Sequence, residues 1–437
     1  MKRMCAELFW SILIVFSRMS KLSYYFRDTC RMCGGILLTK TVSLTPTPPG
    51  NDFLTKEELG KDEHVYPLDL YFCEDCHHVQ LGHPVDPEIL YQKNYTYVSA
   101  TSTQFVNHLQ TYAADMIERF KLKPGMLVSD VGSNDGTCLS FFQDKGMKVV
   151  GVDPAKEIAN KATDNGIETV GDFFSYDLSI KLREKYGAAN YITSHNACAH
   201  IDNLLDVVKG VEYWLDKDGI FVLEVGYFVD VYNNTWFDTI YHEHVDYHTV
   251  APFEKLFAQV GMEVISVQRI TPQGGSIRVM TQKIGGKFQR DDSVNELIAL
   301  EKKLGLNKAE TLHEFDSNIS SVSKELQKLV CSLKGRGKSI AGFGAPTKAT
   351  TLMAHFGIDE NILDFIVDDN PLKQGLYTPI THIPVLSANE LYERKPDYVL
   401  ILAWNFAEPI MKMHKKYSEE IGKFILPMPE PRVVNGE

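Results

Sequence analysis

The chain has 437 residues, of which 44% are hydrophobic and 23% are charged. This composition is that of a soluble globular protein, and the length is too great for one core, so two or three domains are expected. With 45 Lys and Arg against 57 Asp and Glu, the net charge of -12 argues against a surface that wraps nucleic acid, because phosphate binding needs a positive field. Basic residues placed locally must therefore bind any anionic ligand.

The first residues, MKRMCAELFWSILIVFSRMSK, combine a basic start with an apolar run over residues 9–16. This run is too short to span a bilayer, and no small-residue cleavage site follows it. We therefore expect a cytoplasmic protein with no membrane partner. Residues 1–29 form an N-terminal extension in this interpretation, and Met19 is an alternative start.

Four cysteines form two C-x-x-C pairs, Cys30 with Cys33 and Cys73 with Cys76. Two close pairs of thiolates are typical of a tetrahedral Zn²⁺ site. Disulfides would be the alternative in a secreted protein, but they are not expected in a cytosolic chain. Because four thiolates leave no coordination position for water, we expect one structural zinc ion in a domain over residues 30–90.

The next segment has the pattern of a doubly wound α/β sheet. A helix is expected over residues 102–120, a buried strand at 126–128, a glycine-rich loop at 132–136 and a second strand at 148–152. Strand, glycine-rich turn, helix, strand and a final acid open such a sheet. Further strands are expected at 190–193 and 219–225, and an antiparallel pair ends this domain, which we assign to residues 91–290.

A second α/β unit is predicted near the C-terminus. Residues 291–333 carry leucines at helical spacing and predict a helical bridge. The sequence KSIAGFGAPTKATTL then repeats the order of strand, glycine-rich turn and helix, and FIVDDNP and DYVLILAW add buried strands. Residues 291–437 are therefore expected to hold the bridge and a C-terminal α/β domain.

The loop GSNDG at residues 132–136 differs from the G-x-G-x-x-G pattern that binds a pyrophosphate. Asp135 inside it would repel a pyrophosphate but suits a cationic ligand, and S-adenosylmethionine carries a sulfonium and an ammonium group. Asp153 is placed to accept from two ribose hydroxyls, and Asp172 and Phe173 offer a carboxylate and an aromatic wall to adenine. The pattern favours a methyltransferase over a generic nucleotide-binding fold.

The segment YHEHVDYH, residues 241–248, crowds three histidines together. It fails as a zincin motif because Asp246 stands where H-E-x-x-H needs histidine, and an iron site starting at His244 would usually need an antiparallel scaffold. Proton transfer next to a ketone suits it better, because a neutral imidazole is a base at physiological pH. If the segment is extended, Tyr241 and Glu243 share one face and His244 lies on the other; a turn would change this.

A resemblance rests on motifs that occur in a fixed order: VSDVGSNDGTCLSFF, GVDPAKEIANKA, YHEH, QGGSIRV, GFGAPTKATTL and VDDNPLKQG. Together they resemble the sugar C-methyltransferases that act on nucleotide-linked 4-keto deoxysugars, and the resemblance covers residues 30–433. It implies an N-terminal zinc-binding domain, a class I Rossmann-like methyltransferase domain that uses S-adenosylmethionine, and a C-terminal Rossmann-like domain that helps to bind the nucleotide sugar. Methyl transfer to the carbon next to the ketone, C-3, is the expected reaction.

The resemblance also assigns roles to residues. It makes His244 the expected base, with His200 as the alternative, and places Tyr241 and Glu243 beside it. The remaining catalytic candidates are Tyr95 and Tyr97. The expected cofactor contacts are Gly132, Asn134, Asp135, Gly136, Asp153, Pro154, Asp172, Phe173, His195 and Asn196. The expected substrate contacts are Arg278, Gly344, Lys348, Asp368 and Lys373.

Some alternatives stay open. For His195, His242 and His248 a role as hydrogen-bonded structural histidines is the favoured interpretation. The turn with Gly344 and Lys348 suits a diphosphate at a helix N-terminus, or it is an ordinary tight turn. The family usually has Gly-Asn-Thr after this lysine, where the chain has Ala-Thr-Thr at 349–351. A non-catalytic scaffold with a methyltransferase fold is the second functional class.

Overall fold

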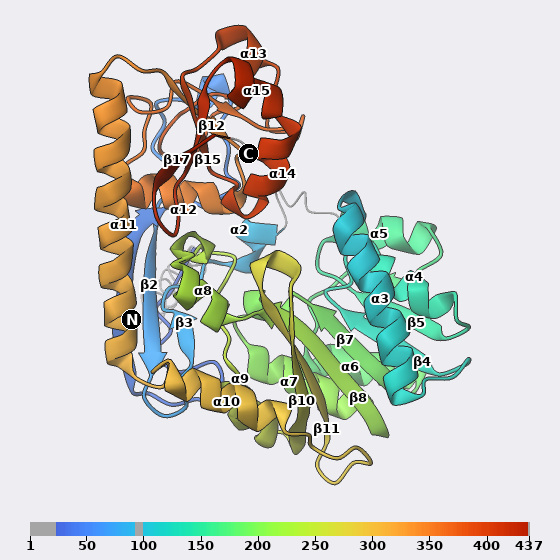
Figure 1. Ribbon diagram of the computed structural model, residues 1–437. Helices are drawn as coiled ribbons and strands as arrows, with labels where there is room; N and C mark the ends of the chain where they lie inside the picture. Colours follow the sequence, from blue (N-terminus) through green and yellow to red (C-terminus); the bar gives the residue numbers. More distant parts are fainter. Residues whose placement is uncertain (1–22, 92–98, 436–437) are drawn as a thin grey trace, which may run out of the picture.

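The computed structural model describes residues 23–91 and 99–435, and these form three sheets with their helices (Figure 1). The expected aromatic residues Tyr95 and Tyr97 lie outside the described residues. No helix within the described ranges is long and apolar enough to cross a membrane.

The first sheet contains four antiparallel strands in the order β1-β2-β3-β9. Their bounds are β1 Leu38–Thr47, β2 Tyr66–Cys73, β3 Val79–Leu81 and β9 Asp246–Tyr247. Buried and partly exposed residues alternate along β2, as expected for a strand with one face in the core. The fourth strand, β9, comes from the histidine segment, so this sheet already joins the cysteine pairs to the candidate catalytic residues.

The second sheet has seven strands in the order β10-β11-β8-β7-β4-β5-β6, parallel except for the antiparallel β10 and β11. The strands are β4 Leu127–Val131, β5 Lys148–Val152, β6 Thr169–Val170, β7 Ala189–His195, β8 Leu215–Gly226, β10 Met262–Ile270 and β11 Ser276–Lys283. The chain moves outward from β4 first through β5 and β6 and then through β7 and β8. Ligands bind at such a reversal, at the carboxyl ends of β4 and β7.

Helices cover both faces of this sheet: α3 Thr103–Phe120, α4 Thr137–Gln143, α5 Lys156–Asp164, α6 Tyr176–Tyr186, α7 Leu204–Trp214, α8 Phe228–Asn234 and α9 Val250–Ala258. Shorter turns are η3 Cys198–His200 and η4 Phe237–Thr239. One expected strand start is wrong: β8 begins at Leu215 rather than at Gly219. Its pairing with β7 shifts register between Leu215 and Ile220, so the expected turn forms an irregular part of the strand.

The third sheet has the order β14-β13-β12-β15-β16-β17 and is parallel except for β17. Its strands are β12 Ile340–Phe343, β13 Ile366–Val367, β14 Val385–Leu386, β15 Tyr398–Ile401, β16 Lys423–Leu426 and β17 Arg432–Val434. Its helices are α12 Thr347–Phe356, α13 Glu390–Arg394, α14 Ala407–Met413 and α15 Lys415–Glu420. The expected bridge consists of α10 Ser293–Lys303 and α11 Ala309–Gly335. These observations confirm the predicted α/β class.

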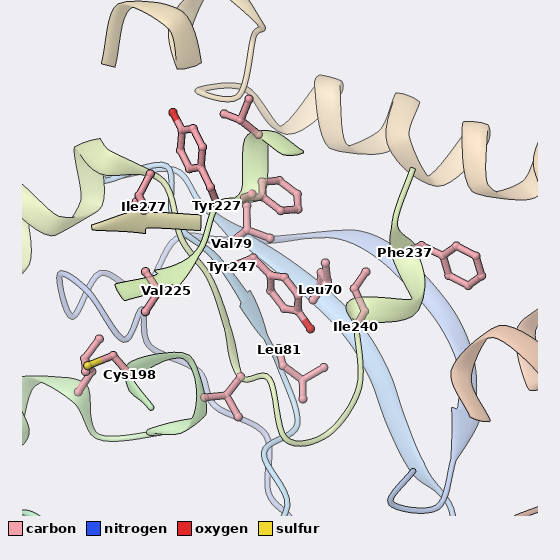
Figure 2. Close-up of a cluster of buried hydrophobic side chains, with 14 of the residues drawn as sticks. Leu70, Val79, Leu81, Cys198, Val225, Tyr227, Phe237, Ile240, Tyr247 and Ile277 are labelled. Carbon is pink, nitrogen blue, oxygen red and sulfur yellow. The ribbon is translucent and has the colours of Figure 1, made fainter. Parts of the chain in front are cut away.

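One buried apolar cluster runs through all three parts. In Figure 2, Tyr247 of the histidine segment and Ile240, which directly precedes the segment, lie among Leu70 and Leu81 of the first sheet. Helix α11 lies along β1, with Leu312, Phe315, Ile319 and Leu326 buried at intervals of three, four and seven residues (Figure 1). The histidine segment is therefore set within a common core rather than on a free loop.

Candidate active site

The four paired cysteines converge on one point. The Sγ atoms of Cys30 and Cys76 are 3.5 Å apart and those of Cys33 and Cys73 are 3.6 Å apart, close to the ~3.8 Å edge of a tetrahedral site with Zn–S bonds of ~2.3 Å. All four are free thiols. Hydrogen bonds with Cys30 and Cys76 stabilise the Cys73 thiolate and lower the pKa of Cys73, whereas the hydrogen bonds of Cys76 with Cys30 and Cys73, together with burial, raise the pKa of Cys76. These residues fit the zinc ion that the sequence predicts.

Both cysteine pairs have the same knuckle turn. The Gly34 amide donates to the Cys30 carbonyl at 2.9 Å, and the His77 amide donates to the Cys73 carbonyl at 2.8 Å. Gly34 and His77 both have a positive φ, 77° and 67°, which closes the turn. We refer below to residues 30–34 and 73–77 as the first and second knuckle.

The glycine-rich loop after β4 turns closely against the end of β7. Gly132 has φ +80°, and a Cβ atom there would lie 2.5 Å from the Cβ of Ala197. Asp153, at the end of β5, accepts from the Asn134 amide at 2.8 Å and from the Ala155 amide at 2.9 Å. Burial raises the pKa of Asp153. The loop and this acid thus form a compact cradle.

Asn134 and Asp135 also bind the protein itself. The Asn134 side chain accepts from the Ser99 amide at 2.9 Å, and Asp135 accepts from the Ala100 amide at 2.9 Å and the Thr137 amide at 3.1 Å. These bonds hold η2, Ser99–Thr101, over the loop. The expected acid in the loop therefore has a positioning role in this structure.

Two buried groups, each two residues before the close contact of Gly132 with Ala197, have no hydrogen-bond partner in the described part of the chain. They are Oδ1 of Asp130, in β4, and both ring nitrogens of His195, at the end of β7, with Nδ1 of His195 3.9 Å from Oδ1 of Asp130. Buried polar groups normally have partners, so a ligand that carries an ammonium group fits here, as S-adenosylmethionine does. Sequence reasoning missed Asp130, although an acid inside the otherwise apolar run LVSDV was a signal.

The other expected cofactor residues surround the same edge. Pro154 follows Asp153 directly, and Asn196 has φ +56° and donates from its amide to the Glu224 carbonyl at 2.7 Å. Asp172 and Phe173 follow β6, and the Phe173 ring is 39% exposed. An exposed ring beside the cradle is available to stack on a planar ligand.

Arg278 does not join the lysines of the third sheet, contrary to expectation. Its Nε atom donates to Glu224 at 2.7 Å, and its guanidinium lies 4.7 Å from the ring centre of Tyr112. His108 contacts the other oxygen of Glu224 at 2.7 Å. Burial raises the pKa of Glu224, but the bond from His108 and nearby positive charge outweigh it and hold this pKa at about 2. The arginine therefore balances a buried carboxylate within the methyltransferase sheet.

The histidine segment turns, so the extended arrangement is wrong. The His244 amide donates to the Tyr241 carbonyl at 2.9 Å, and this turn brings the Tyr241 hydroxyl to 2.9 Å from Nε2 of His244. Nδ1 of His244 lies 3.0 Å from the Thr239 carbonyl, which can only accept. Nδ1 therefore carries the proton in the neutral ring, and the lone pair of Nε2 faces the phenol.

His200 joins this pair from η3. Its ring centre is 4.9 Å from that of His244, and the Val245 amide donates to the Ala199 carbonyl at 2.8 Å. Burial lowers the pKa of His244 to about 4 and that of His200 to about 3. Both imidazoles are therefore neutral at physiological pH and available as bases.

Glu243 lies where the three parts of the chain meet. It is 8% exposed and accepts from the side chain of Asn51 at 3.1 Å, and Thr347 of α12 donates to the same asparagine at 2.9 Å. Burial raises the pKa of Glu243 to about 7, which the Asn51 bond and the charge of Lys373 partly oppose. Near neutral pH this carboxyl is therefore present in both its protonated and its ionised form.

Lys348 reaches the same region from α12. Its ammonium lies 3.5 Å above the ring of Trp404 and 3.9 Å from Asp238, which also accepts from the Trp404 indole at 2.6 Å. Burial lowers the pKa of Lys348 to about 8, and the charge of Lys348 contributes to the lowered pKa of His244. The lysine therefore acts electrostatically on the histidine.

The remaining expected substrate residues form one set at the carboxyl ends of β12 and β13. Gly344 has φ +84°, and a Cβ there would lie 2.5 Å from the Cβ of Ala403. Asp368 accepts from the Ala345 amide at 2.6 Å, and the Lys373 ammonium donates to the Ala345 carbonyl at 2.7 Å. This turn therefore packs tightly, and Gly344 leaves the space that the packing needs.

Sequence reasoning missed Asn51, Asp238 and Trp404, which come into the site only through contacts between distant segments. Nε2 of His242 contacts the Tyr66 carbonyl at 3.3 Å, as expected for a structural histidine. His248 is fully buried against Phe253, with ring centres 4.8 Å apart.

Comparison with known proteins agrees with the three parts of the fold. Residues 30–91 match a zinc-binding domain family, residues 105–267 a methyltransferase domain, and residues 271–429 the C-methyltransferase C-terminal domain. The chain is 35% identical over 410 residues to C-methyltransferase NovU from Streptomyces niveus, covering 94% of this chain and 97% of NovU.

Two solved structures are also similar in part. The magnesium protoporphyrin IX methyltransferase from Synechocystis is 13% identical, with a TM-score of 0.32 over 44% of this chain and 86% of its own. The PH0226 protein from Pyrococcus horikoshii is 17% identical, with a TM-score of 0.34 over 43% of this chain and 95% of its own. On the family matches and the full-length similarity to NovU, the chain belongs to the C-methyltransferase family and is an S-adenosylmethionine-dependent enzyme with an N-terminal zinc-binding domain.

Proposed function

We propose that this enzyme methylates a carbon next to the ketone of a nucleotide-linked 4-keto deoxysugar, with C-3 as the expected carbon. The observation that carries the proposal is the meeting of Tyr241, Glu243 and His244 with His200 at the junction of the three parts. A ketone activates the neighbouring C–H bond, and this set contains both bases for the proton and donors for the enolate oxygen.

His244 is the proposed base. Its Nδ1–H donates to the Thr239 carbonyl, which leaves the lone pair of Nε2 directed at the Tyr241 hydroxyl. The substrate proton passes to Nε2 directly, or to the phenol oxygen while the phenol proton passes to Nε2. His200, 4.9 Å away between ring centres, is the alternative base. Either route gives an enolate beside an imidazolium.

The enolate oxygen needs donors, because an imidazole with a pKa of about 4 is a weak base. Glu243 in its protonated form and the ammonium of Lys348 are the proposed donors. S-adenosylmethionine supplies the electrophilic methyl group when it is bound. Transfer of that methyl group to the enolate carbon would break the sulfonium C–S bond and restore the ketone, and the His244 imidazolium would then return its proton to solvent.

The nucleotide diphosphate is proposed to lie at the loops of the third sheet. Lys373 and the first turn of α12 supply positive charge there. The same observations support an ordinary tight βα turn. The affinity of the enzyme for the nucleotide without its sugar distinguishes a diphosphate site from such a turn.

The test is incubation of the zinc-loaded enzyme with S-adenosylmethionine and a panel of nucleotide 4-keto deoxysugars, followed by mass spectrometry of the sugar. A mass gain of one methyl group on carbon is expected with at least one of them. If every 4-keto deoxysugar stays unmethylated while another activated ketone is methylated, the substrate class is wrong. If the protein binds S-adenosylmethionine but methylates neither class, the scaffold alternative is correct.

A further inference from the structure

Two carboxylates connect the two zinc knuckles to the segments that carry the two candidate bases. Asp202 stands two residues after His200, and Asp246 stands two residues after His244. Arg31, which lies between two zinc-binding cysteines, binds both of these regions. Its Nη2 atom is 2.8 Å from Asp202, and its Nε atom is 3.9 Å from Asp246.

The second knuckle reaches the same carboxylate. His78 directly follows it, and Nε2 of His78 is 2.7 Å from Oδ1 of Asp246. The side chains of Arg31, His78 and Asp246 are all fully buried. The two knuckles therefore converge on one carboxylate that belongs to the histidine segment.

Hydrogen bonds to backbone carbonyls form a second connection between the knuckles and the histidine segment. The guanidinium of Arg31 donates from Nη1 to the carbonyls of Leu81 at 2.8 Å and Val245 at 3.3 Å, and the Leu81 amide donates to the Val245 carbonyl at 2.9 Å. Strand β9 pairs with β3, which follows the second knuckle. In Figure 2, Tyr247 of β9 packs among the side chains of this sheet. A movement of either knuckle is thus transmitted to the segment that carries His244.

We infer that Arg31 is a positioning residue, through which zinc bound between the knuckles holds His200 and His244 in their active arrangement by way of Asp202 and Asp246. The inference rests on the proposed role of the two histidines. Without Arg31, Asp202 keeps its contact with Arg27 and Asp246 keeps its contact with His78, but the buried cation that joins the two segments to the first knuckle is lost. The zinc site then acts on catalysis without touching the substrate.

The chain offers a matched control. Arg27 also binds Asp202, at 3.0 Å, but it lies outside the knuckles and 19% of its side chain is exposed. Arg27→Met therefore removes an arginine from the same carboxylate without breaking the connection between a knuckle and Asp246. Arg31→Met removes the connection and keeps side-chain volume, and Arg31→Lys keeps the charge but loses the planar fork.

The experiment measures hydrogen exchange by mass spectrometry on the peptide over residues 239–248 in the full-length protein, with zinc content measured for each sample. In zinc-loaded wild-type protein the amides of His244 and Val245 should be protected by their bonds to Tyr241 and Ala199. We expect about tenfold faster exchange in zinc-loaded Arg31→Met and in wild-type protein after chelation, and a change of about twofold or less in Arg27→Met. Chelation of Arg31→Met should add little further.

The coupling must also be reciprocal, so Arg31→Met should bind zinc about tenfold more weakly in competition with a chelator, although all four cysteines are present. Arg31→Lys should restore part of the protection. Protection of the peptide that is independent of zinc, or equal effects of Arg27→Met and Arg31→Met, would overturn the inference. If Arg31→Met does not fold, Asp246→Asn is measured by the same criteria. If His244→Asn and His200→Asn both retain turnover while protection follows zinc, the proposed histidine base fails and the coupling stands.

Discussion

The behaviour of the site is decided first by single buried groups. His244 is neutral because burial lowers its pKa, and the Thr239 carbonyl fixes which of its nitrogens carries the proton. Replacement by asparagine keeps a polar side chain of similar size but removes the base. We expect His244→Asn to lower kcat by about three orders of magnitude, the usual contribution of a general base. S-adenosylmethionine affinity, measured by calorimetry, should stay within about twofold.

A second variant, His200→Asn, distinguishes between the two imidazoles. His200→Asn should lower kcat less than His244→Asn if His244 is the base. A loss of turnover in His200→Asn, with normal turnover in His244→Asn, would assign the proton transfer to His200 instead.

The raised pKa of Glu243 predicts that the stability of the folded protein depends on pH. Its pKa rises on folding from 4.5 to about 7, so the folded chain holds its proton where the unfolded chain has lost it. The carboxyl therefore contributes stability that is full below pH 4.5 and is lost as the pH rises through 7, a change of about 3 kcal/mol. We expect the melting temperature of Glu243→Gln, relative to wild type, to rise between pH 5 and pH 8. A difference that is constant over this range would contradict the shift.

The elements show how local backbone shape sets the cofactor cradle. Gly132 and Gly125 have similar backbone angles, with φ +80° and +85°, but only Gly132 approaches another residue, Ala197. We expect Gly132→Ala to weaken S-adenosylmethionine binding about tenfold or more, because the loop must move away from the end of β7. Gly125→Ala carries the same backbone strain in open space. It should lower the melting temperature with little effect on affinity, and equal effects on affinity would show that strain alone matters.

Element order was predictable from sequence because strands, glycine-rich turns and helices are written in local patterns. The two C-x-x-C pairs, β5 and the antiparallel closing strands were found in this way. The turn at residues 241–244 was not, because its chemistry depends on a hydrogen bond between Tyr241 and His244 that alternation along an extended strand does not predict. Asp238 and Trp404 meet across 166 residues, and no local pattern records such a contact.

At the scale of the whole molecule, the site is assembled from all three parts of the chain. Asn51 comes from the zinc-binding part, the histidines from the methyltransferase part, and Lys348 and Lys373 from the C-terminal part. This arrangement explains why the buried apolar cluster is continuous through the molecule. The proposed base His244 and the proposed donor Glu243 lie on one segment, and the second proposed donor, Lys348, comes from the C-terminal part.

Lys348 provides a test of this assembly. Because burial lowers its pKa to about 8, its ammonium is lost as the pH rises through that value, and a donor to the enolate oxygen is lost with it. We expect kcat to fall above about pH 8, and Lys348→Arg to shift this fall to higher pH, since a guanidinium stays charged. If the fall of kcat at high pH is unchanged in Lys348→Arg, the fall belongs to another titrating group.

The central claim is that a histidine at this junction removes a proton from the carbon next to a ketone. The most direct measurement incubates the zinc-loaded enzyme in D₂O with a nucleotide 4-keto deoxysugar and S-adenosylhomocysteine, so that an enolate forms but no methyl group is available. Wild-type enzyme should exchange one hydrogen for deuterium beside the ketone, and His244→Asn should not. Exchange at the wild-type rate in His244→Asn and His200→Asn alike would contradict a histidine base.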